Sequence, residues 1–232
     1  MTRMFPFITV TWNPIGGECS HKCVGCWARE LAERHKWAKY QGEPRIDEKQ
    51  INRRFKDGDF VFVQDMTDLF AEDVPDSVIS RVLGQLHKSS DAKFLLLTKN
   101  PKRYYDVLPH IPENCVLGAT IESNRIKPRI SKAQNRYERI HTMLYLREMT
   151  DFQLFVSVEP IMEFDLDYFA VALGKWLRLW AVAVGYDNYG NGFPEPQLSK
   201  TMQLIAKLES MGVKVIRKTL RESKTEKARA IF

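Results

Sequence analysis

Short apolar runs alternate with charged stretches along most of the chain, and this alternation limits the fold more than any other feature. The runs are rich in Val, Ile, Leu and Phe, which is typical of strands buried on both faces of a parallel sheet. We expect strands at residues 7–12, 59–64, 93–98, 115–121, 153–158, 179–184 and 213–216. We expect helices at residues 28–39, 75–88, 102–108, 131–148, 166–173 and 197–211. The sequence therefore predicts an α/β fold with a parallel sheet.

The handedness of the connections extends this prediction to a barrel. Crossovers between parallel strands are right-handed, and a series of them curls the sheet into a full or partial barrel. We therefore expect a partial (β/α)6–7 barrel similar to a TIM barrel. No linker rich in Pro, Ser or Gly interrupts the 232 residues, so we expect residues 1–232 to form a single domain, with a basic tail from about residue 218.

The composition argues against a membrane protein and against a secreted one. No apolar run approaches the roughly 18 residues that a spanning helix needs, and residues 1–10 lack a signal-peptide cleavage pattern. Four cysteines, three of them crowded together, do not make a disulfide framework, so we expect a reducing cytoplasm. The fourth, Cys115, begins a predicted strand and is expected to be a buried core thiol. The net charge of +6 weakly indicates an anionic partner.

The other three cysteines fall within residues 18–27, directly after the first predicted strand. Cys19, Cys23 and Cys26 have the spacing C-x3-C-x2-C. Thiolates are soft ligands that suit iron–sulfur clusters or zinc. A closed zinc site needs four ligands, and the nearby candidate, His21, lies only two residues from both Cys19 and Cys23. We interpret the loop as an iron–sulfur site with one open position, with a structural zinc site as the alternative.

Polar residues or glycine follow the predicted strands, and the carboxyl ends of the strands are where barrels carry their sites. The strand-end candidates are Asn13, Gln64–Asp68, Thr98–Asn100, Glu122–Asn124, Ser157, Glu159 and Gly185–Asn188. Glu122 and Glu159 end buried strands and are candidates for ligand binding, with pairing to Lys99 or an arginine as the structural alternative. Asp65 and Asp68 are equally suited to capping a helix or forming a turn.

The cysteine spacing after the first strand of a β/α barrel resembles the radical S-adenosylmethionine (SAM) superfamily. More closely, the chain resembles the phage Gp37/Gp68-like family, a domain of unknown function. The matching stretches are residues 11–14, 23–26, 61–63, 66–70, 97–101, 116–122, 157–160 and 182–185. Two features depart from that family. Its loop usually has more residues between the first two cysteines, and it has Gly-Gly-Glu-Ser-Gly where this chain has residues 184–188.

The resemblance implies a radical SAM enzyme. Cys19, Cys23 and Cys26 would bind three irons of a [4Fe–4S] cluster, and the fourth iron would bind the amino and carboxylate groups of SAM. Reductive cleavage of SAM would give a 5′-deoxyadenosyl radical that abstracts hydrogen from a substrate, with a flavodoxin- or ferredoxin-like protein as reductant. The residues expected to contact SAM are Gln64, Asp65, Met66, Thr67, Glu122, Ser123, Ser157, Glu159 and Gly185.

The substrate is not specified by any motif. Basic residues concentrate in residues 125–147 and 214–229, and both segments are suited to contact phosphates. A nucleic-acid substrate is therefore one interpretation, while a small nucleotide or a peptide stays open. The alternative from another functional class is a nucleic-acid-binding module whose cysteine loop holds a structural zinc ion and does no chemistry. The sequence predicts no membrane partner and no particular oligomeric state.

Overall fold

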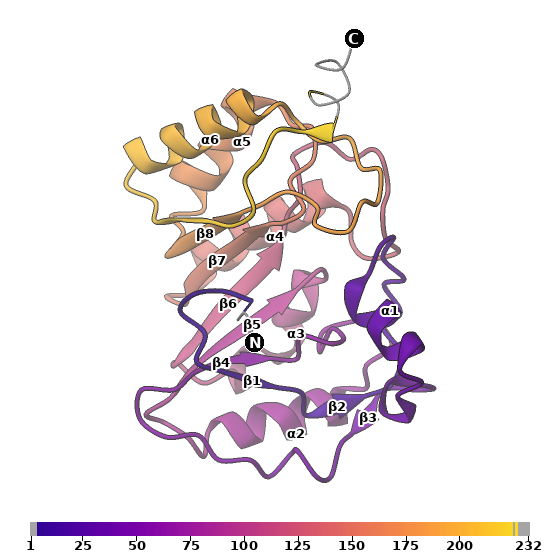
Figure 1. Ribbon diagram of the computed structural model, residues 1–232. Coiled ribbons are helices and arrows are strands. Elements are labelled where there is room, and N and C mark those ends of the chain that lie inside the picture. Colours follow the sequence, from indigo (N-terminus) through magenta and orange to yellow (C-terminus); the bar gives the residue numbers. More distant parts are fainter. Residues whose placement is uncertain (1–3, 225, 227–232) are drawn as a thin grey trace. The chain divides into compact units, whose positions relative to one another are not determined.

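All seven predicted strands are present in the computed structural model, which describes residues 4–224 and 226 (Figure 1). The strands are β1 (Val10–Trp12), β4 (Phe60–Val63), β5 (Lys93–Thr98), β6 (Cys115–Thr120), β7 (Gln153–Val158), β8 (Ala181–Val184) and β9 (Val215–Arg217). They form one sheet in the order β1-β4-β5-β6-β7-β8-β9, which is their order along the chain. The predicted α/β class with a parallel sheet is confirmed.

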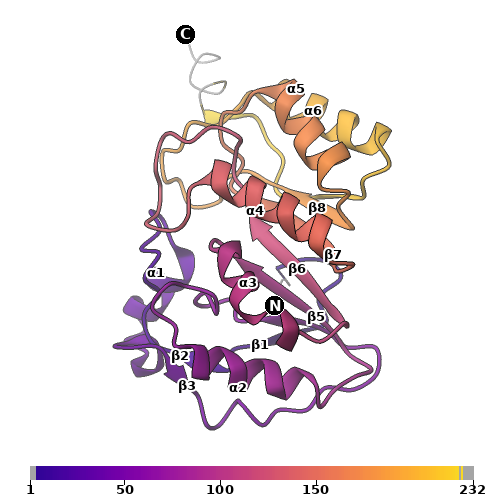
Figure 2. The same cartoon turned by 180° about the vertical axis from the view of Figure 1, so that it is seen from behind.

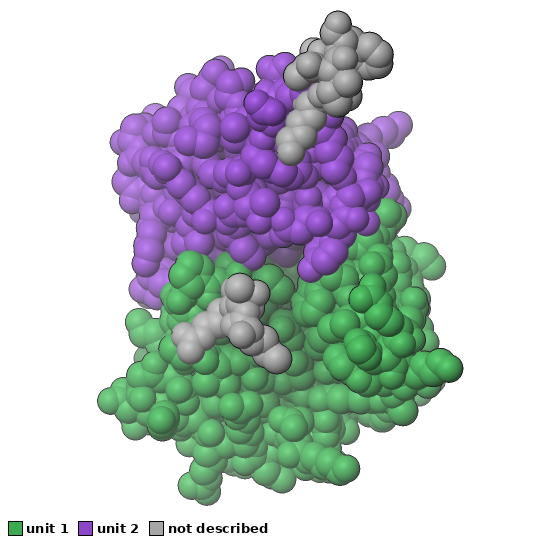
Figure 3. Space-filling model, viewed as in Figure 1, with its two compact units in different colours: residues 1–118, 130–133 green, residues 119–129, 134–232 purple. Residues whose placement is uncertain are grey.

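Contacts along the chain divide it into two compact units, and each is described by itself (Figure 3). Unit 1 comprises residues 1–118 and 130–133, and unit 2 comprises residues 119–129 and 134–232. Strand β6 contributes residues to both units. The expectation of a single domain stays a prediction.

Unit 1 is built on β1, β4 and β5. Val10 is in register with Val61, and Phe60 with Lys93, both in parallel pairs. Helix α2 (Asp76–Leu86) buries the apolar side chains of one face, at spacings of three and four residues: Ile79, Val82, Leu83 and Leu86. Burying each such side chain contributes about 1.5–3 kcal/mol. Figure 2 shows α2 and α3 (Tyr104–Val107) on the face of these strands that is turned away in Figure 1.

Unit 2 is built on β7, β8 and β9 with three helical segments. Phe155 is in register with Ala181, and Val182 with Val215, again in parallel. The helical segments are α4 (Arg136–Met149), α5 (Leu166–Val171), which continues as the π-helical turn η4 (Ala172–Trp176), and α6 (Leu198–Ser210). None of the helices that the structure describes is long and apolar enough to cross a membrane.

Three predicted helices differ from the observed ones. The helix expected at residues 131–148 begins at Arg136, because Asn135 and Glu138 form a capping box that fixes its first turn. The helix expected at residues 28–39 is α1 (Trp27–Arg34) followed by the 3-10 turn η1 (Ala38–Tyr40), because Lys36 has a φ of 51° between them. The segment 102–108 consists of η2 (Pro101–Arg103), α3 and the start of η3 (Leu108–His110).

A second, two-stranded sheet was not predicted at all. Strand β2 (Ile15–Gly16) pairs antiparallel with β3 (Arg45–Ile46), so that residues 39–43 lie beside the start of the cysteine loop. Strands of two residues leave no periodic pattern in a sequence.

Candidate metal centre and cofactor site

The cysteine loop connects β2 to α1, and its entry is fixed by backbone hydrogen bonds. The N–H groups of Gly17 and Glu18 donate to the carbonyls of Lys39 and Gly42, each at 2.8 Å. Gly17 has a φ of 100°, and a Cβ atom there would lie 2.5 Å from the Glu43 carbonyl oxygen. Only glycine therefore allows this close approach.

The middle of the loop is held by a segment distant in sequence. Val24 donates to the Ile130 carbonyl at 2.8 Å, and Lys132 donates to the His21 carbonyl at 2.7 Å. These bonds explain why residues 130–133 belong to unit 1, whereas helix α4, which begins at Arg136, belongs to unit 2.

The three clustered cysteines line one cavity. Cys19, Cys23 and Cys26 are half-buried, and none is in a disulfide. The cavity has a volume of about 130 Å³, and Met66 and Thr67 from the loop after β4 also line it. Cys26 directly precedes α1, whose N-terminal end favours negative charge. Three soft donors thus share one space beside a helix N-terminus.

The pKa of Cys19 reflects this crowding. Burial first, and then the charges of Asp68, Cys23 and Cys26, raise the pKa of Cys19 to about 12. A metal group that binds the Cys19 thiolate must therefore displace a proton.

His21 is buried and engaged by a carboxylate. Its Nε2 atom lies 2.8 Å from Asp68 Oδ2, which also accepts hydrogen bonds from Thr98 Oγ1 at 2.9 Å and Lys99 N at 2.8 Å. Burial alone would raise the pKa of Asp68, but the charge of His21 and these hydrogen bonds lower it below the ordinary value. The Nε2 atom of His21 is thus committed to Asp68, which weakens the case for His21 as a fourth zinc ligand.

The donor set of the cavity bears on which metal group it could hold. A closed zinc site needs four ligands, whereas three cysteine thiolates can hold a [4Fe–4S] cluster that keeps one iron open. Three free cysteines that line one cavity fit such a cluster.

The loop after β4 contains four predicted contact residues, and three of their side chains form hydrogen bonds within the protein: Gln64, Asp65 and Thr67. Gln64 is buried with a φ of 65°, and its Oε1 accepts from Ile15 N at 3.2 Å while its Nε2 donates to Thr67 Oγ1 at 2.6 Å. Asp65 Oδ1 accepts from Asn13 Nδ2 at 2.8 Å, and burial raises the pKa of Asp65. Gln64 and Asp65 therefore brace the loop that carries Met66 and Thr67 to the cavity.

Three predicted contact residues in unit 2 are deeply buried. Glu122 pairs with Arg139 at 3.0 Å, and Arg139 also donates to the carbonyls of Thr120 and Gln134. Ser123 Oγ donates to the carbonyl of Glu163, and the carbonyl of Ser157 accepts from Ile121 N at 2.9 Å. For Glu122, the arginine pairing kept open in the sequence interpretation is observed.

Glu159 and Gly185 lie beside the C-terminal segment. Glu159 pairs with Lys218 at 2.9 Å. A Cβ atom on Gly185 would lie 2.9 Å from the Lys218 Cβ and 3.4 Å from Glu159 Oε1. Glycine is therefore required at this position by Lys218, whichever ligand binds nearby.

Residues 218–224 and 226, called the C-terminal strap below, bind the loop that follows β8. Arg221 forms two hydrogen bonds with Glu195, at 2.9 and 2.6 Å, and one with the carbonyl of Asp187 at 2.7 Å. Burial would raise the pKa of Glu195, but Arg221 and the backbone N–H of Lys224 lower it. Several basic residues expected to contact phosphates are thus paired with acids of the same chain: Arg217, Lys218, Arg221 and Lys224. Lys227 and Arg229 of the predicted basic tail lie outside the described residues.

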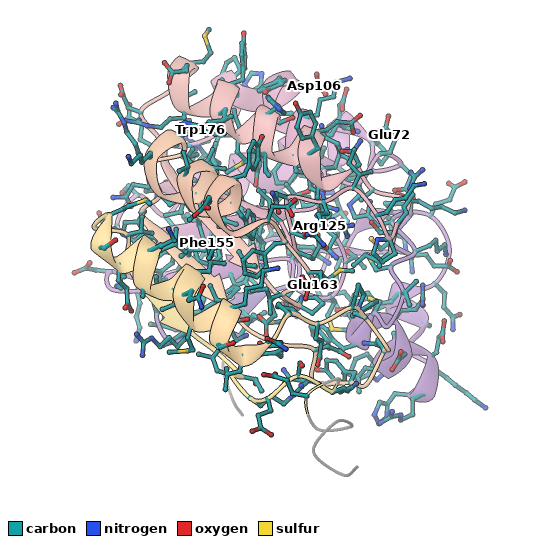
Figure 4. The ribbon with its side chains drawn as sticks, turned by 90° about the horizontal axis from the view of Figure 1, so that it is seen from above. Glu72, Asp106, Arg125, Phe155, Glu163 and Trp176 are labelled. Atoms are coloured by element: carbon teal, nitrogen blue, oxygen red, sulfur yellow. The ribbon has the colours of Figure 1, made fainter. Side chains whose placement is uncertain are left out.

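The basic segment 125–147 also serves the fold. Arg125 pairs with Asp165 and lies 3.9 Å from Glu163, and Figure 4 shows Arg125 and Glu163 near each other. Buried Arg136 donates to the carbonyls of Arg125, Ile126 and Pro128, each at 2.7 Å. These arginines stabilise the loop before α4.

Two aromatic residues at the cavity were not among the predicted site residues. Trp37 and Tyr40 line the same space as the cysteines, and burial, with the charges of Asp65 and Asp47, raises the pKa of Tyr40 to about 12. They were hidden inside and just beyond a predicted helix, so nothing in the sequence pattern separated them from ordinary helix residues.

Comparison with known proteins gives a family and a fold. A family model described as "Protein of unknown function (DUF5131)" matches residues 4–185. No curated protein matches the sequence. Among solved structures, a mutant of spore photoproduct lyase is similar with a TM-score of 0.61 and 10% identity, over 94% of this chain and 80% of that one.

Two similar structures contain bound ligands. A spore photoproduct lyase mutant with bound AdoMet and dinucleoside spore photoproduct has a TM-score of 0.55 and 11% identity, over 86% of this chain and 60% of that one. Streptococcus suis SuiB bound to S-adenosylmethionine has a TM-score of 0.53 and 10% identity, over 92% of this chain and 48% of that one. The chain thus spans less than two thirds of the matched chain in each of these two structures. The likeness shows the fold class, which is the partial (β/α) barrel of the radical SAM type.

Proposed function

This chain belongs to the family described as protein of unknown function (DUF5131), and we propose that it is a radical SAM enzyme. The observation that carries the proposal is the cavity shared by Cys19, Cys23 and Cys26. These cysteines follow strands β1 and β2 in a fold of the radical SAM type. The motifs in residues 11–185 further support kinship with the phage Gp37/Gp68-like family.

The three thiolates would hold a [4Fe–4S] cluster whose fourth iron binds SAM. When bound and reduced, this group supplies the electron that cleaves SAM and so the radical that removes hydrogen from a substrate. The protein's part would be to hold the cluster and to orient SAM. Gln64 and Asn13 fix the loop after β4, so that Met66 and Thr67 face the cavity where the SAM amino group would lie.

The contacts to SAM that we expect from Glu122, Ser123, Ser157, Glu159 and Gly185 of unit 2 stay a prediction. Within unit 2, Arg139 pairs with Glu122, the Glu163 carbonyl accepts from Ser123, and Lys218 pairs with Glu159.

The partners follow from the proposed chemistry. The cluster needs a one-electron reductant of the flavodoxin or ferredoxin kind, and thiolate ligands are best preserved in a reducing cytoplasm. A nucleic-acid or nucleotide substrate is supported by the net charge of +6 and by the dinucleoside bound to the similar lyase. That ligand belongs to the lyase, and its relevance here is part of the proposal.

Anaerobic purification and incubation with SAM and dithionite test the proposal. We expect a brown protein with about four irons per chain, which releases 5′-deoxyadenosine. Cys23→Ala should lose iron and SAM cleavage, while Cys115→Ala, the matched control, should keep both because Cys115 is buried in β6. A colourless protein that holds one zinc ion would overturn the proposal in favour of a structural metal site.

A further inference from the structure

We propose that α4 and η4 form a binding surface for single-stranded nucleic acid, separate from the cysteine cavity and independent of any metal group. The surface, called the α4–η4 surface below, includes the exposed side of α4 and a groove of about 480 Å³ between α4 and η4. The groove is lined by Leu144, Tyr145, Glu148, Lys175, Trp176 and Arg178, all from unit 2. Figure 4 shows Trp176 beside the pink helix α4.

Exposed aromatic and large apolar side chains are concentrated on this surface. Tyr145, Met149 and Trp176 are 53%, 60% and 42% exposed. With Tyr137 and Tyr168 they make up half of the ten large apolar side chains that are exposed in the described part of the chain. Such a concentration on one face indicates a binding surface.

The rings are held in place by their neighbours. Trp176 packs edge-to-face against Tyr168, with ring centroids 5.4 Å apart, and Tyr137 packs on His141 at 4.3 Å. Trp176 also ends a π-helical turn, a feature that is frequent at functional sites. Preorganised rings lose little freedom when a flat base stacks on them.

The groove also carries available positive charge. Lys175 and Arg178 are exposed, and neither forms an ion pair with any residue that the structure describes. By contrast, Lys218 and Arg221 of the C-terminal strap are paired with Glu159 and Glu195. The carboxylate of Glu148 lines the same groove, so two cations stand against one anion. The charge of the groove therefore suits phosphate.

The spacing of the rings favours a single strand over a duplex or a protein. Tyr137, His141 and Tyr145 recur every four residues, which is about 6 Å along a helix. Bases can stack on these rings only when their faces are exposed, as in single strands. Polar-tipped Tyr and Trp rings beside unpaired cations match such a ligand better than they match an apolar protein surface.

Fluorescence anisotropy of a fluorescein-labelled 12-nucleotide single strand, in DNA and RNA forms, tests the surface with the full chain. Trp176→Ala should weaken binding at least about five-fold, the lower end of what stacking one base contributes. Trp176→Phe, which keeps a ring, should stay within about two-fold of the wild type. The double variant with Lys175→Ala and Arg178→Ala tests the cations. The slope of the logarithm of its association constant against the logarithm of the salt concentration should be smaller in magnitude by about 1.4, because each phosphate contact on a single strand contributes about 0.7.

Two variants elsewhere in unit 2 serve as matched controls. Met202→Ala removes an exposed apolar side chain from α6, and Lys207→Ala removes one positive charge from the same helix. Both should bind like the wild type. The proposal is overturned if the wild type binds no single strand, or if the controls weaken binding as much as Trp176→Ala does. It is also overturned if Trp176→Ala dissociates a dimer in sedimentation but leaves binding of the strand unchanged. Circular dichroism melting of each variant separates these outcomes from unfolding.

Discussion

At the scale of single residues, the cysteines could be predicted and the partners of the other polar residues could not. The spacing of Cys19, Cys23 and Cys26 is local, so the sequence displays it directly. Gln64 binds Ile15 and Glu122 binds Arg139, and each pairing depends on how distant segments pack. A polar residue at a strand end therefore marked the correct region without indicating whether its side chain was available.

Gly185→Ala should destabilise the protein by about 1–3 kcal/mol, because the new methyl group would lie 2.9 Å from the Lys218 Cβ. Gly84→Ala is the matched control, since Gly84 is helical and exposed with nothing within 4 Å, and should be neutral or stabilising by up to about 1 kcal/mol. Urea denaturation measures both free energies of unfolding. Equal effects of the two changes would show that Lys218 does not pack against Gly185.

Arg139→Leu should lower the free energy of unfolding by about 3–5 kcal/mol, because it leaves the Glu122 carboxylate buried without its cation. Adding Glu122→Gln should recover part of the loss, since a neutral amide is easier to bury than a charge. Chemical denaturation of the two variants and the wild type checks this. A loss below about 1 kcal/mol for Arg139→Leu would argue against a buried ion pair.

At the scale of elements, the strands were predictable and the helix starts were not. β5 and β7 lie where the sequence placed them, because buried parallel strands are continuous apolar runs. The start of α4 was placed five residues early, because residues 131–135 (Ser-Lys-Ala-Gln-Asn) fit a helix as well as a loop. Their role became visible only through the bonds of Val24 and Lys132 to distant partners.

The attachment of the C-terminal strap should depend on pH through Glu195. The pKa of Glu195 is lowered in the folded state, so its pairing stabilises the protein above its ordinary pKa of 4.5 and is lost as pH falls through the folded value. Arg221→Gln should therefore lower the melting temperature at pH 7, and the difference from the wild type should shrink below pH 4.5.

Arg217→Gln is the control for the strap, because its partner Glu209 lies on the surface, where ion pairs contribute about 0–1 kcal/mol. We expect little change in melting temperature at any pH for this variant. A deficit of Arg221→Gln that stays constant from pH 7 to pH 3 would contradict the role of Glu195.

At the scale of the whole molecule, the barrel class follows from the alternation of strands and helices, whereas the use of the basic residues does not. The concentration of basic residues suggested two phosphate-binding segments. Several of these residues are instead engaged within the chain, among them Arg125, Arg136, Lys218 and Arg221. The exposed cations of the groove, Lys175 and Arg178, lie outside both segments. Charge counted along a sequence does not reveal which charges are paired.

The central claim is that the three cysteines hold a [4Fe–4S] cluster whose open iron binds SAM. Electron paramagnetic resonance of the anaerobic, dithionite-reduced protein, recorded with and without SAM, tests it most directly. We expect the signal of one reduced [4Fe–4S] cluster per chain, altered when SAM is added and absent from Cys23→Ala. A reconstituted protein that shows no cluster signal, or one that SAM leaves unchanged, would contradict the claim.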